Sequence, residues 1–555
     1  MHENGCVSVM QISLFDTANG TDIPMKTDMQ HDREERIVLT EEITTKLLSY
    51  NLETYLSDVA TLGLKTTWDY ICEFVLTQSM CNAFLSVSAL GELYEIGLAV
   101  QNKIKKKKRG QYYTPDDVAT VMGNWLTQCV GDAVCDVACG TGKLILTYLD
   151  LIGYDEAKRL INSGKVYLYD IDRIALKICK TAIIRKYSIE NPRVIHDIHC
   201  DFLDRSIALP ADCKVIANPP YAAIENFEDC WQRTDVLLNT KELYAVFMEK
   251  IFSQARAAVV ITPFSFISGN KFYSLREKMC KTGNGSIVAF DNVPGNIFCG
   301  RKHGVFNTNT ANSVRAAITV FRADSMRKGF QVSPLIRFKN TERKEVLETK
   351  VLEDELPEER QLVSRENPAF RKIDKRLTEV YAAWVNQSNY KVKDVLQENS
   401  HFLIDMPNTC RYFTTASHRK LKRSGSITLH IENADDFCFL YCFLNSSFAY
   451  WWWRIYDGGI TYPSGLLKDM PVTLNLLSDA DKAFFKQLCL EMIEKEKEYI
   501  ITKKNAGAVQ ENIKFPKEYR RKINTRILCI LRCECNLDIL DSIHANQFCK
   551  RGSKL

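Results

Sequence analysis

The chain has 555 residues, of which 46% are hydrophobic and 25% charged, and its formal net charge is +5. This composition is that of a globular protein and excludes an overall polycation, and the length exceeds one ordinary core, so we expect two to four domains. The twenty cysteines have no regular spacing and the first thirty residues lack the apolar core of a signal peptide, so we expect free thiols in a reducing, cytoplasmic compartment.

The N-terminal part divides into a helical region and a basic run. From about residue 40 to 101 apolar residues recur at i, i+3 and i+4, so we assign 1–101 to a mostly helical region that starts with a polar stretch. The sequence KIKKKKRG follows at 103–110. Alone it fits a solvated linker, but next to the motifs that follow we favour an arm that contacts phosphates.

Strand-like and helical segments alternate between about 118 and 322. The apolar, strand-like runs are 133–138, 165–172, 193–202, 214–220 and 257–267. This alternation predicts an α/β fold, with a mostly parallel, doubly wound Rossmann-like sheet that helices cover on both faces. We place this domain at 102–325.

The sequence pattern changes after residue 325, where charged, turn-rich segments alternate with short strand-like segments. An amphipathic pattern predicts a long helix at 478–504. The apolar stretch 437–453 is interrupted by polar residues and followed at once by Arg454, which favours buried core over a membrane span. We therefore expect a second, mixed α+β domain at 326–555.

The sequence VCDVACGTGKL at 134–144 predicts a strand that ends at Asp136, a glycine turn and then a helix. Gly140 and Gly142 allow a tight turn and the close approach of a ligand to the backbone, although a purely structural turn is about as plausible for such a motif alone. A phosphate-binding P-loop is excluded, because Val137 and Leu144 stand where that motif needs a glycine and a hydroxyl residue.

The next two strands also end in acidic residues. Asp170 is the candidate for binding ribose hydroxyls, and Asp172 is expected to cap the following helix. Asp201 is a candidate acceptor and Phe202 a candidate apolar wall for an adenine ring, while a helix cap and a core aromatic remain equally good readings of this pair. A glycine turn with acidic strand ends indicates a nucleoside pocket without a phosphate clamp.

A fourth strand ends abruptly in Asn218-Pro219-Pro220-Tyr221. An exocyclic amino group conjugated to a ring is a poor nucleophile. The Asn218 side-chain oxygen and the Pro219 carbonyl can accept its two hydrogens, so that its lone pair points at an electrophile held over the glycine turn, and Tyr221 can stack on the ring. Positioning and charge stabilisation then carry most of the acceleration, without a dedicated general base.

These motifs resemble the S-adenosylmethionine-dependent N6-adenine DNA methyltransferases of the gamma arrangement, over about 109–322. In that family GQYYTP (110–115) implies that Thr114 contacts the methionine carboxylate, and a C-terminal domain recognises the DNA target. The chain departs from the family at Val137, usually a proline, and at Lys143, usually a small residue. The resemblance implies a cofactor site, no metal, and these cofactor-binding residues: Thr114, Asp136, Ala138, Gly140, Gly142, Asp170, Asp201 and Phe202.

The family also places a second aromatic residue against the flipped adenine. We prefer Phe298, which we expect to end a strand-like segment, and Phe306 is the alternative; a core role is open for both. Arg301, Lys302 and His303 between them are candidate DNA contacts. The catalytic set implied by the resemblance is therefore Asn218, Pro219, Pro220, Tyr221 and Phe298.

Two features of the C-terminal part carry weaker hypotheses. A basic, aromatic patch suits DNA about as well as plain surface, and it comprises Arg411, Tyr412, His418, Arg419 and Lys420. Cysteines at 529–535 with His544 and Cys549 suggest zinc only weakly, because no CxxC pair is present.

The expected function is site-specific methylation of a flipped-out adenine in double-stranded DNA, as the modification component of a restriction–modification system. A cognate restriction endonuclease would be a separate chain, and the enzyme would work in the bacterial cytoplasm, on the nucleoid when bound to DNA. Two alternatives stay open: methylation of RNA or of a protein glutamine, and a catalytically silent DNA-recognition subunit. The intact Asn218-Pro219-Pro220-Tyr221 argues against the silent subunit.

Overall fold

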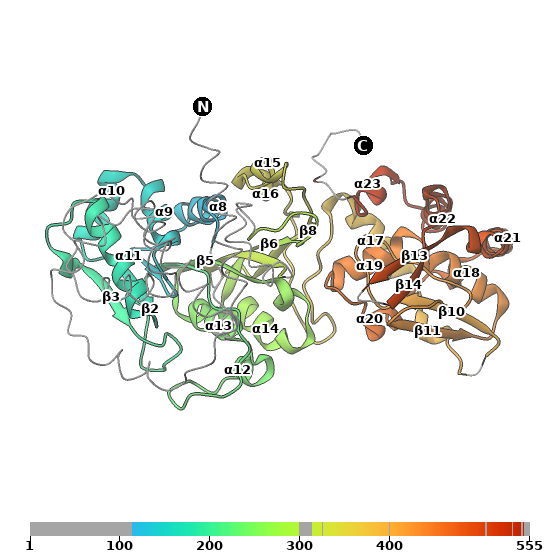
Figure 1. The fold of residues 1–555 in the computed structure, drawn as a ribbon, viewed down its shortest axis with the longest axis horizontal. Helices are drawn as coiled ribbons and strands as arrows, with labels where there is room; N and C mark the ends of the chain where they lie inside the picture. Colours follow the sequence, from blue (N-terminus) through green and yellow to red (C-terminus); the bar gives the residue numbers. More distant parts are fainter. Residues whose placement is uncertain are drawn as a thin grey trace, which may run out of the picture.

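The computed structural model describes residues 114–298, 314–324, 326–398, 400–505, 508–535, 537–545 and 548. Several expectations lie outside these residues: the N-terminal helical region 1–101, the basic run, residues 301–303, Phe306 and Cys549. The described residues form an α/β domain, on the left of Figure 1, and a C-terminal domain on its right.

The α/β domain is built on one eight-stranded sheet with the order β3-β2-β1-β4-β5-β7-β6-β8. All neighbouring strands are parallel except that β7 runs antiparallel to both β5 and β6. The carboxyl ends of all strands but β7 therefore meet at one edge of the sheet. The strands are β1 (Ala133–Asp136), β2 (Val166–Asp170), β3 (Ile195–His199), β4 (Cys213–Ala217), β5 (Ala257–Pro263), β6 (Gly283–Phe290), β7 (Ala316–Ala323) and β8 (Gly329–Ile336).

Helices cover both faces of this sheet, which confirms the doubly wound α/β fold. Successive residues of a strand point to opposite faces, so Val259 belongs to one buried cluster and Val260 to another. One face is covered by α8 (Asp116–Thr127), α9 (Lys143–Leu151), α10 (Tyr154–Asn162) and α11 (Arg173–Lys186), and the other by α12 (Asp235–Thr240), α13 (Leu243–Gln254) and α14 (Tyr273–Thr282).

The sheet continues beyond residue 325, where the sequence analysis placed the domain boundary. Strand β8 lies after that point, and so do α15 (Arg343–Val346) and α16 (Thr349–Asp354). Helix α16 packs on α8, where Trp125 Nε1 donates a hydrogen bond of 2.9 Å to Glu353 Oε1. The buried core of the C-terminal domain begins only at Leu377, so the boundary falls between β8 and that residue.

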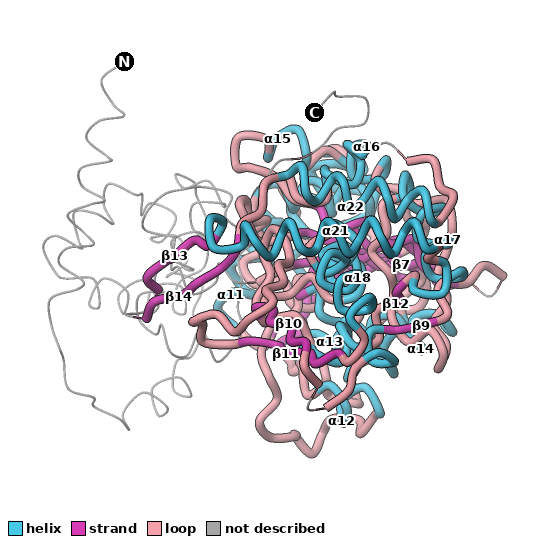
Figure 2. The backbone as a smooth tube through the Cα atoms, turned by 90° about the vertical axis from the view of Figure 1, so that its right-hand side faces the viewer, coloured by secondary structure: helices cyan, strands magenta, loops and turns pink. Residues whose placement is uncertain are grey.

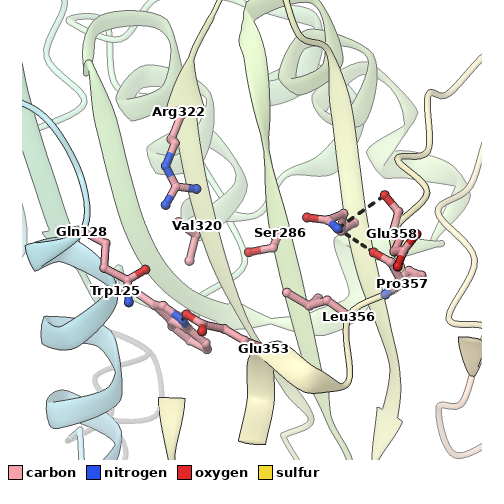
Figure 3. Close-up of a pocket in the computed structure, with 10 residues that line it drawn as sticks. Trp125, Gln128, Ser286, Val320, Arg322, Glu353, Leu356, Pro357 and Glu358 are labelled. Carbon is pink, nitrogen blue, oxygen red and sulfur yellow. Dashed lines mark hydrogen bonds between the residues drawn. The ribbon is translucent and has the colours of Figure 1, made fainter. Parts of the chain in front are cut away.

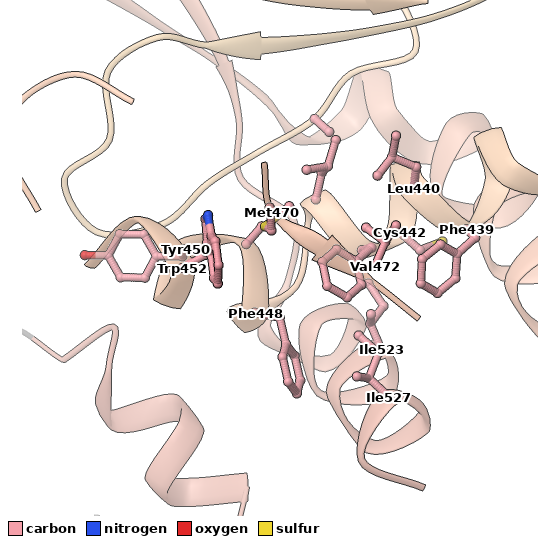
Figure 4. Close-up of a cluster of buried hydrophobic side chains, with 14 of the residues drawn as sticks. Phe439, Leu440, Cys442, Phe448, Tyr450, Trp452, Met470, Val472, Ile523 and Ile527 are labelled. Atoms are coloured by element: carbon pink, nitrogen blue, oxygen red, sulfur yellow. The ribbon is translucent and has the colours of Figure 1, made fainter. Parts of the chain in front are cut away.

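The C-terminal domain is a mixed α+β structure around an aromatic core. Figure 4 shows side chains of α18 (Ala434–Leu444), α19 (Ser447–Tyr456) and α22 (Lys517–Ile530) meeting in it. Residues 437–453 are buried there as expected, and no helix among the described residues is long and apolar enough to cross a membrane. Its other elements are α17 (Thr378–Gln387), β9 (Tyr390–Lys391), β10 (Phe402–Pro407), β11 (Ser426–Ile431), α20 (Ser464–Lys468), β12 (Pro471–Val472) and α23 (Leu537–Ser542).

The long helix expected at 478–504 is wrong at its C-terminal end. Helix α21 spans Asp479–Lys495 and starts with a capping box between Ser478 and Asp481. The chain then forms a hairpin of β13 (Ile500–Asn505) and β14 (Ala508–Ile513), which extends to one side of the body in Figure 2. The β-branched residues at 500–502 favour a strand over a continued helix.

A buried charge cluster joins the two domains. Asp291, directly after β6, accepts hydrogen bonds from Arg315 (3.0 Å), Arg337 (2.7 Å) and Arg454 of α19 (3.2 Å). All four side chains are buried. Burial alone would raise the pKa of Asp291, but the charges of the three arginines outweigh it and hold that pKa below its usual value. The cluster ties the carboxyl edge of the sheet to the C-terminal domain.

Candidate active site

The carboxyl edge of the sheet brings the predicted glycine turn beside the ends of β2 and β4. Gly140 and Gly142 have φ angles of +50° and +96°, in the left-handed region that favours glycine. A Cβ on Gly142 would lie 2.6 Å from Cys179 Sγ, whereas a Cβ on Gly140 would meet nothing within 4 Å. Gly142 is therefore needed for packing, and Gly140 borders open space.

Asp170 closes this turn from the neighbouring strand. Its Oδ2 accepts a 2.7 Å hydrogen bond from the Gly140 N–H, and its Oδ1 accepts another of 2.7 Å from the Asp172 N–H. Burial raises the pKa of Asp170 to about 6, although these two hydrogen bonds act to lower it. Asp172 caps α11 by accepting from the Ile174 and Ala175 N–H groups, which confirms its expected role.

Two further observations fit a ligand at this edge. Asp136 is fully buried, and among the described residues its Oδ2 has no hydrogen-bond partner, while its Oδ1 accepts a long bond of 3.4 Å from the Ala138 N–H. Burial raises the pKa of Asp136 to about 8. Ile171, between Asp170 at the end of β2 and Asp172 at the N-cap of α11, is 67% exposed. The sequence analysis missed Ile171, although an apolar residue between two acidic ones at a strand end was a usable signal.

Asp201 and Phe202 both have partners within the protein. Asp201 Oδ2 accepts a 2.6 Å hydrogen bond from Trp231 Nε1, and its Oδ1 accepts from the Leu203 N–H at 2.9 Å. The Phe202 ring is 3% exposed and packs against Tyr169 and Phe247. Phe202 matches the reading as a core aromatic, whereas Asp201 accepts within a turn and caps no helix among the described residues. A contact of Phe202 with adenine stays a prediction.

The predicted catalytic motif starts directly after β4, which ends at Ala217. Asn218 Nδ2 donates a 2.9 Å hydrogen bond to the Oγ1 of Thr114, which lies two residues before the start of α8. The Tyr221 hydroxyl donates 3.1 Å to the Ile261 carbonyl of β5. The structure therefore brings Thr114, Asn218 and Tyr221 together at the carboxyl edge, where Pro219 is buried.

Phe298 lies close to this motif, but not where the sequence analysis placed it. Strand β6 ends at Phe290, so Phe298 belongs to the following loop, 291–298, rather than to a strand end. Its ring centroid is 5.9 Å from that of Tyr221, with the planes 64° apart. A base stacked between two parallel rings needs about 3.5 Å on each side. The edge-on contact leaves no such room, so the two rings would have to separate to hold a base.

The basic patch expected in the C-terminal domain is divided by the structure. Arg411 and Lys420 are exposed, whereas Arg337 lies 5.1 Å over the Tyr412 ring. His418 and Arg419 pair with the buried Glu496. Within the part of the chain that the structure describes, no group of three or more His, Cys, Asp and Glu side chains is placed to hold a metal ion.

A cavity of about 270 Å³ lies elsewhere on the α/β domain, against the face that α8 and α16 cover (Figure 3). Trp125, Arg322 and Glu353 are among the residues that line it. Arg322 pairs with Ala257 at the start of β5, so it lies at the edge opposite the candidate active site. We assign no role to this cavity in the chemistry of that site.

The family model described as N-6 DNA Methylase matches residues 86–390, more than half of the sequence. The chain belongs to the N-6 DNA methylase family. The Type II methyltransferase M.VspI of Vibrio sp. (strain 343) is 28% identical to this N-6 DNA methylase over 162 residues, which are 28% of the present chain and 36% of M.VspI. The match thus spans about a third of that relative's length.

Solved structures that resemble this N-6 DNA methylase are distant in sequence. A nuclease-deletion mutant of the Type ISP restriction-modification enzyme LlaGI, in complex with a DNA substrate mimic, gives a TM-score of 0.44 at 11% identity and covers 89% of this chain and 56% of its own. A putative class I S-adenosylmethionine-dependent methyltransferase from Listeria monocytogenes gives 0.35 at 14% identity, covering 53% and 93%. The fold assignment rests on the strand order and pairing given above.

Proposed function

We propose that this N-6 DNA methylase is a site-specific DNA adenine N6-methyltransferase that uses S-adenosylmethionine. One observation carries the proposal: Asn218-Pro219-Pro220-Tyr221 stands at the end of β4, beside a glycine turn and an acidic β2 end, in a chain of this family. An amide, a rigid carbonyl and an aromatic ring at that place suit a conjugated amino group as nucleophile.

The residues at the carboxyl edge fit the cofactor. S-adenosylmethionine supplies an activated methyl group when bound. The open space at Gly140 admits it, Asp170 is placed to accept hydrogen bonds from ribose hydroxyls, and the exposed Ile171 offers an apolar surface to adenine. Thr114 is our candidate for the methionine carboxylate, as the resemblance implies. The orphaned Oδ2 of Asp136, at the end of β1, suits a polar group of the ligand.

The protein's own groups orient the amino group of the target. The hydrogen bond from Nδ2 to Thr114 Oγ1 holds the Asn218 amide in place at the end of β4. We assign acceptance of the two amino hydrogens to the Asn218 side-chain oxygen and the Pro219 carbonyl, and stacking to Tyr221. The amino nitrogen then keeps its lone pair towards the methyl donor, and after methyl transfer the cationic nitrogen loses one of its protons to solvent without a dedicated general base.

The substrate in this proposal is an adenine in paired DNA, turned out of the helix into the site. The C-terminal domain would read the flanking sequence, and the exposed Arg411 and Lys420 are candidates for phosphate contacts. We further propose that the enzyme is the modification component of a restriction–modification system, because M.VspI is a Type II methyltransferase. A separate restriction endonuclease would be its partner, and both would act in the bacterial cytoplasm.

The decisive experiment is to express the protein in a host without adenine methylation and to sequence its DNA by a method that detects N6-methyladenine. We expect methylation at one short motif, and none with the Asn218→Ala variant. Methylation found only in RNA or on a protein glutamine would replace the proposed substrate. No methylation of any of these, by folded protein that binds S-adenosylmethionine, would favour a silent DNA-recognition subunit.

A further inference from the structure

Arg343 of α15 connects two distant segments of the α/β domain. Its Nε and Nη2 donate to the two oxygens of Asp117 at 2.6 and 2.8 Å, while Nη1 and Nη2 donate to the carbonyls of Asn296 and Ile297, both at 2.7 Å. The Arg343 side chain is 8% exposed. A planar guanidinium can hold a carboxylate by two parallel bonds and still reach two carbonyls, which an ammonium group cannot do.

One arm of this contact leads to Asn218. Asp117 lies in the first turn of α8, and Thr114 precedes the same helix. The Ala119 N–H donates to the Pro115 carbonyl, so the chain next to Thr114 is part of the helix start. Thr114 Oγ1 in turn accepts the hydrogen bond from Asn218 Nδ2. Holding Asp117 therefore fixes the acceptor that orients the Asn218 amide.

The other arm leads to Tyr221. Ile297 directly precedes Phe298, and the Phe298 N–H donates 2.8 Å to Asn296 Oδ1, so the bound carbonyls and the aromatic ring share one short turn. The Phe298 ring contacts the Tyr221 ring edge-on. Holding the Asn296 and Ile297 carbonyls therefore fixes the backbone that carries Phe298 beside Tyr221, while the Phe298 ring can still turn away from Tyr221 to admit a base.

We propose that Arg343 is a positioning residue for methyl transfer: it sets the amide of Asn218 through α8 and the ring pair of Tyr221 and Phe298 through the loop 291–298. This inference rests on the proposed function. It adds a residue from beyond the expected catalytic domain that touches neither substrate nor cofactor. A misplacement of about 1 Å at a reacting centre can cost about 10²-fold in rate, so loss of this double contact should show in catalysis.

The test compares Arg343→Lys with a matched control, Arg360→Lys. Arg360 Nη1 also donates to backbone carbonyls of the sheet, those of Gly285 (3.0 Å) and Gly329 (3.4 Å), but near the starts of β6 and β8 and so at the opposite edge. Single-turnover methylation is measured on paired DNA and on DNA with an abasic site opposite the target adenine. Melting temperatures show that each variant is folded.

We expect Arg343→Lys to lower the single-turnover rate on paired DNA by about 10²-fold. The loss should be smaller on the abasic duplex, where less flipping energy has to be recovered by stacking. Asp117→Ala, which breaks the α8 arm alone, should slow both duplexes equally, because that arm serves Asn218. With 2-aminopurine at the target position, Arg343→Lys should change the fluorescence of the flipped base relative to wild type and to Arg360→Lys.

Three results would overturn the inference. The first is a rate for Arg343→Lys within about twofold of wild type, and the second is an equal loss in Arg360→Lys, which would indicate general destabilisation. If Arg343→Lys does not fold, the Asp117→Ala variant provides the test. The third overturning result is then a wild-type methylation rate for Asp117→Ala. A wild-type protein that methylates no adenine would instead overturn the proposed function, and this inference with it.

Discussion

Asn218 and Thr114 are joined by a hydrogen bond of 2.9 Å, although they are 104 residues apart in the chain. The bond runs from the end of β4 to the start of α8. The amide that we assign to the target amino group is therefore oriented by the residue that we assign to the cofactor carboxylate. On these assignments, occupation of the cofactor site and alignment of the Asn218 amide would be coupled through one hydroxyl group.

Replacement of Asn218 by alanine should nearly abolish methyl transfer. Loss of one aimed polar group at such a site typically costs about 10²–10³ in rate. Binding of S-adenosylmethionine, measured by calorimetry, should stay close to normal, because Asn218 serves the target base. Thr114→Ser keeps the hydroxyl acceptor and is the control that should retain most of the rate. A near wild-type single-turnover rate for Asn218→Ala would remove Asn218 from the mechanism.

Tyr221 should act through its ring rather than its hydroxyl. Tyr221→Phe loses the hydrogen bond to the Ile261 carbonyl, which is worth about 1 kcal/mol of stability, and keeps the stacking surface. Tyr221→Ala and Phe298→Ala lose stacking worth roughly 1–3 kcal/mol per base, so both should be slower on paired DNA than on an abasic duplex. If Tyr221→Phe were as slow as Tyr221→Ala, the hydroxyl would matter more than the ring.

The two glycines of the turn should separate ligand binding from folding. A methyl group on Gly140 would point into open space, so Gly140→Ala should fold, at a cost of about 1–2 kcal/mol for the left-handed backbone, and should bind S-adenosylmethionine poorly. Gly142→Ala adds a clash with Cys179 Sγ and should lose more stability. Thermal melting and calorimetry on both variants check this. Normal cofactor binding by Gly140→Ala would show that the ligand does not approach this turn.

Asp136 should make stability depend on pH. Its pKa is raised from 3.8 to about 8 by burial, so between these values the folded protein holds a proton that the unfolded chain has released. The contribution of this group to the free energy of unfolding therefore falls as the pH rises through that window, and it levels off above about 8. Asp136→Asn stays neutral. The stability difference between wild type and this variant, measured by urea unfolding from pH 5 to 9, should show this fall, and a constant difference would contradict it.

Asp291 should be the most sensitive position of the domain junction. Asp291→Asn leaves three buried arginines without their counter-charge, and breaking a buried ion pair in this way costs about 3–5 kcal/mol. Arg454→Met leaves two arginines on Asp291 and should cost less. Glu156→Ala, in an exposed pair with Arg159, should change stability by about 1 kcal/mol or less. Urea unfolding measures all three, and equal losses for Asp291→Asn and Glu156→Ala would contradict this ranking.

The α/β domain was predictable because its signals are local. Apolar runs that end in acidic residues, glycine or proline gave β1, β2 and β4, and the spacing of Asp172 gave the α11 cap. Helix α10, between α9 and β2, was missed. Strand β8 was missed too, because charged, turn-rich sequence surrounds it and only its pairing with β6 marks it as part of the sheet.

The site was predictable for residues that stand in contiguous motifs and not for contacts between distant segments. Arg343 has no motif of its own, and its bond to Asp117 spans 226 residues. The same holds for Trp231, which occupies Asp201, and for Glu496, which pairs with two of the five residues of the expected basic patch. The predicted helix at 478–504 also ran past the end of α21 into β13, because helical periodicity outweighed the β-branched residues at 500–502 and the pairing of β13 with β14 could not be read locally.

The charge cluster at Asp291 sets a condition for building chimeras. A C-terminal domain taken from another methylase would have to supply an arginine at the place of Arg454 and an acceptor for Arg337 at the place of the Arg411 carbonyl. Without them, Asp291, Arg315 and Arg337 would stay buried at the domain junction with some of their hydrogen-bond partners missing. An exchange that moves residues 411–454 as one block takes the Arg411 carbonyl and Arg454 from the same donor protein. An exchange boundary within that block would take these two contacts of the cluster from different proteins.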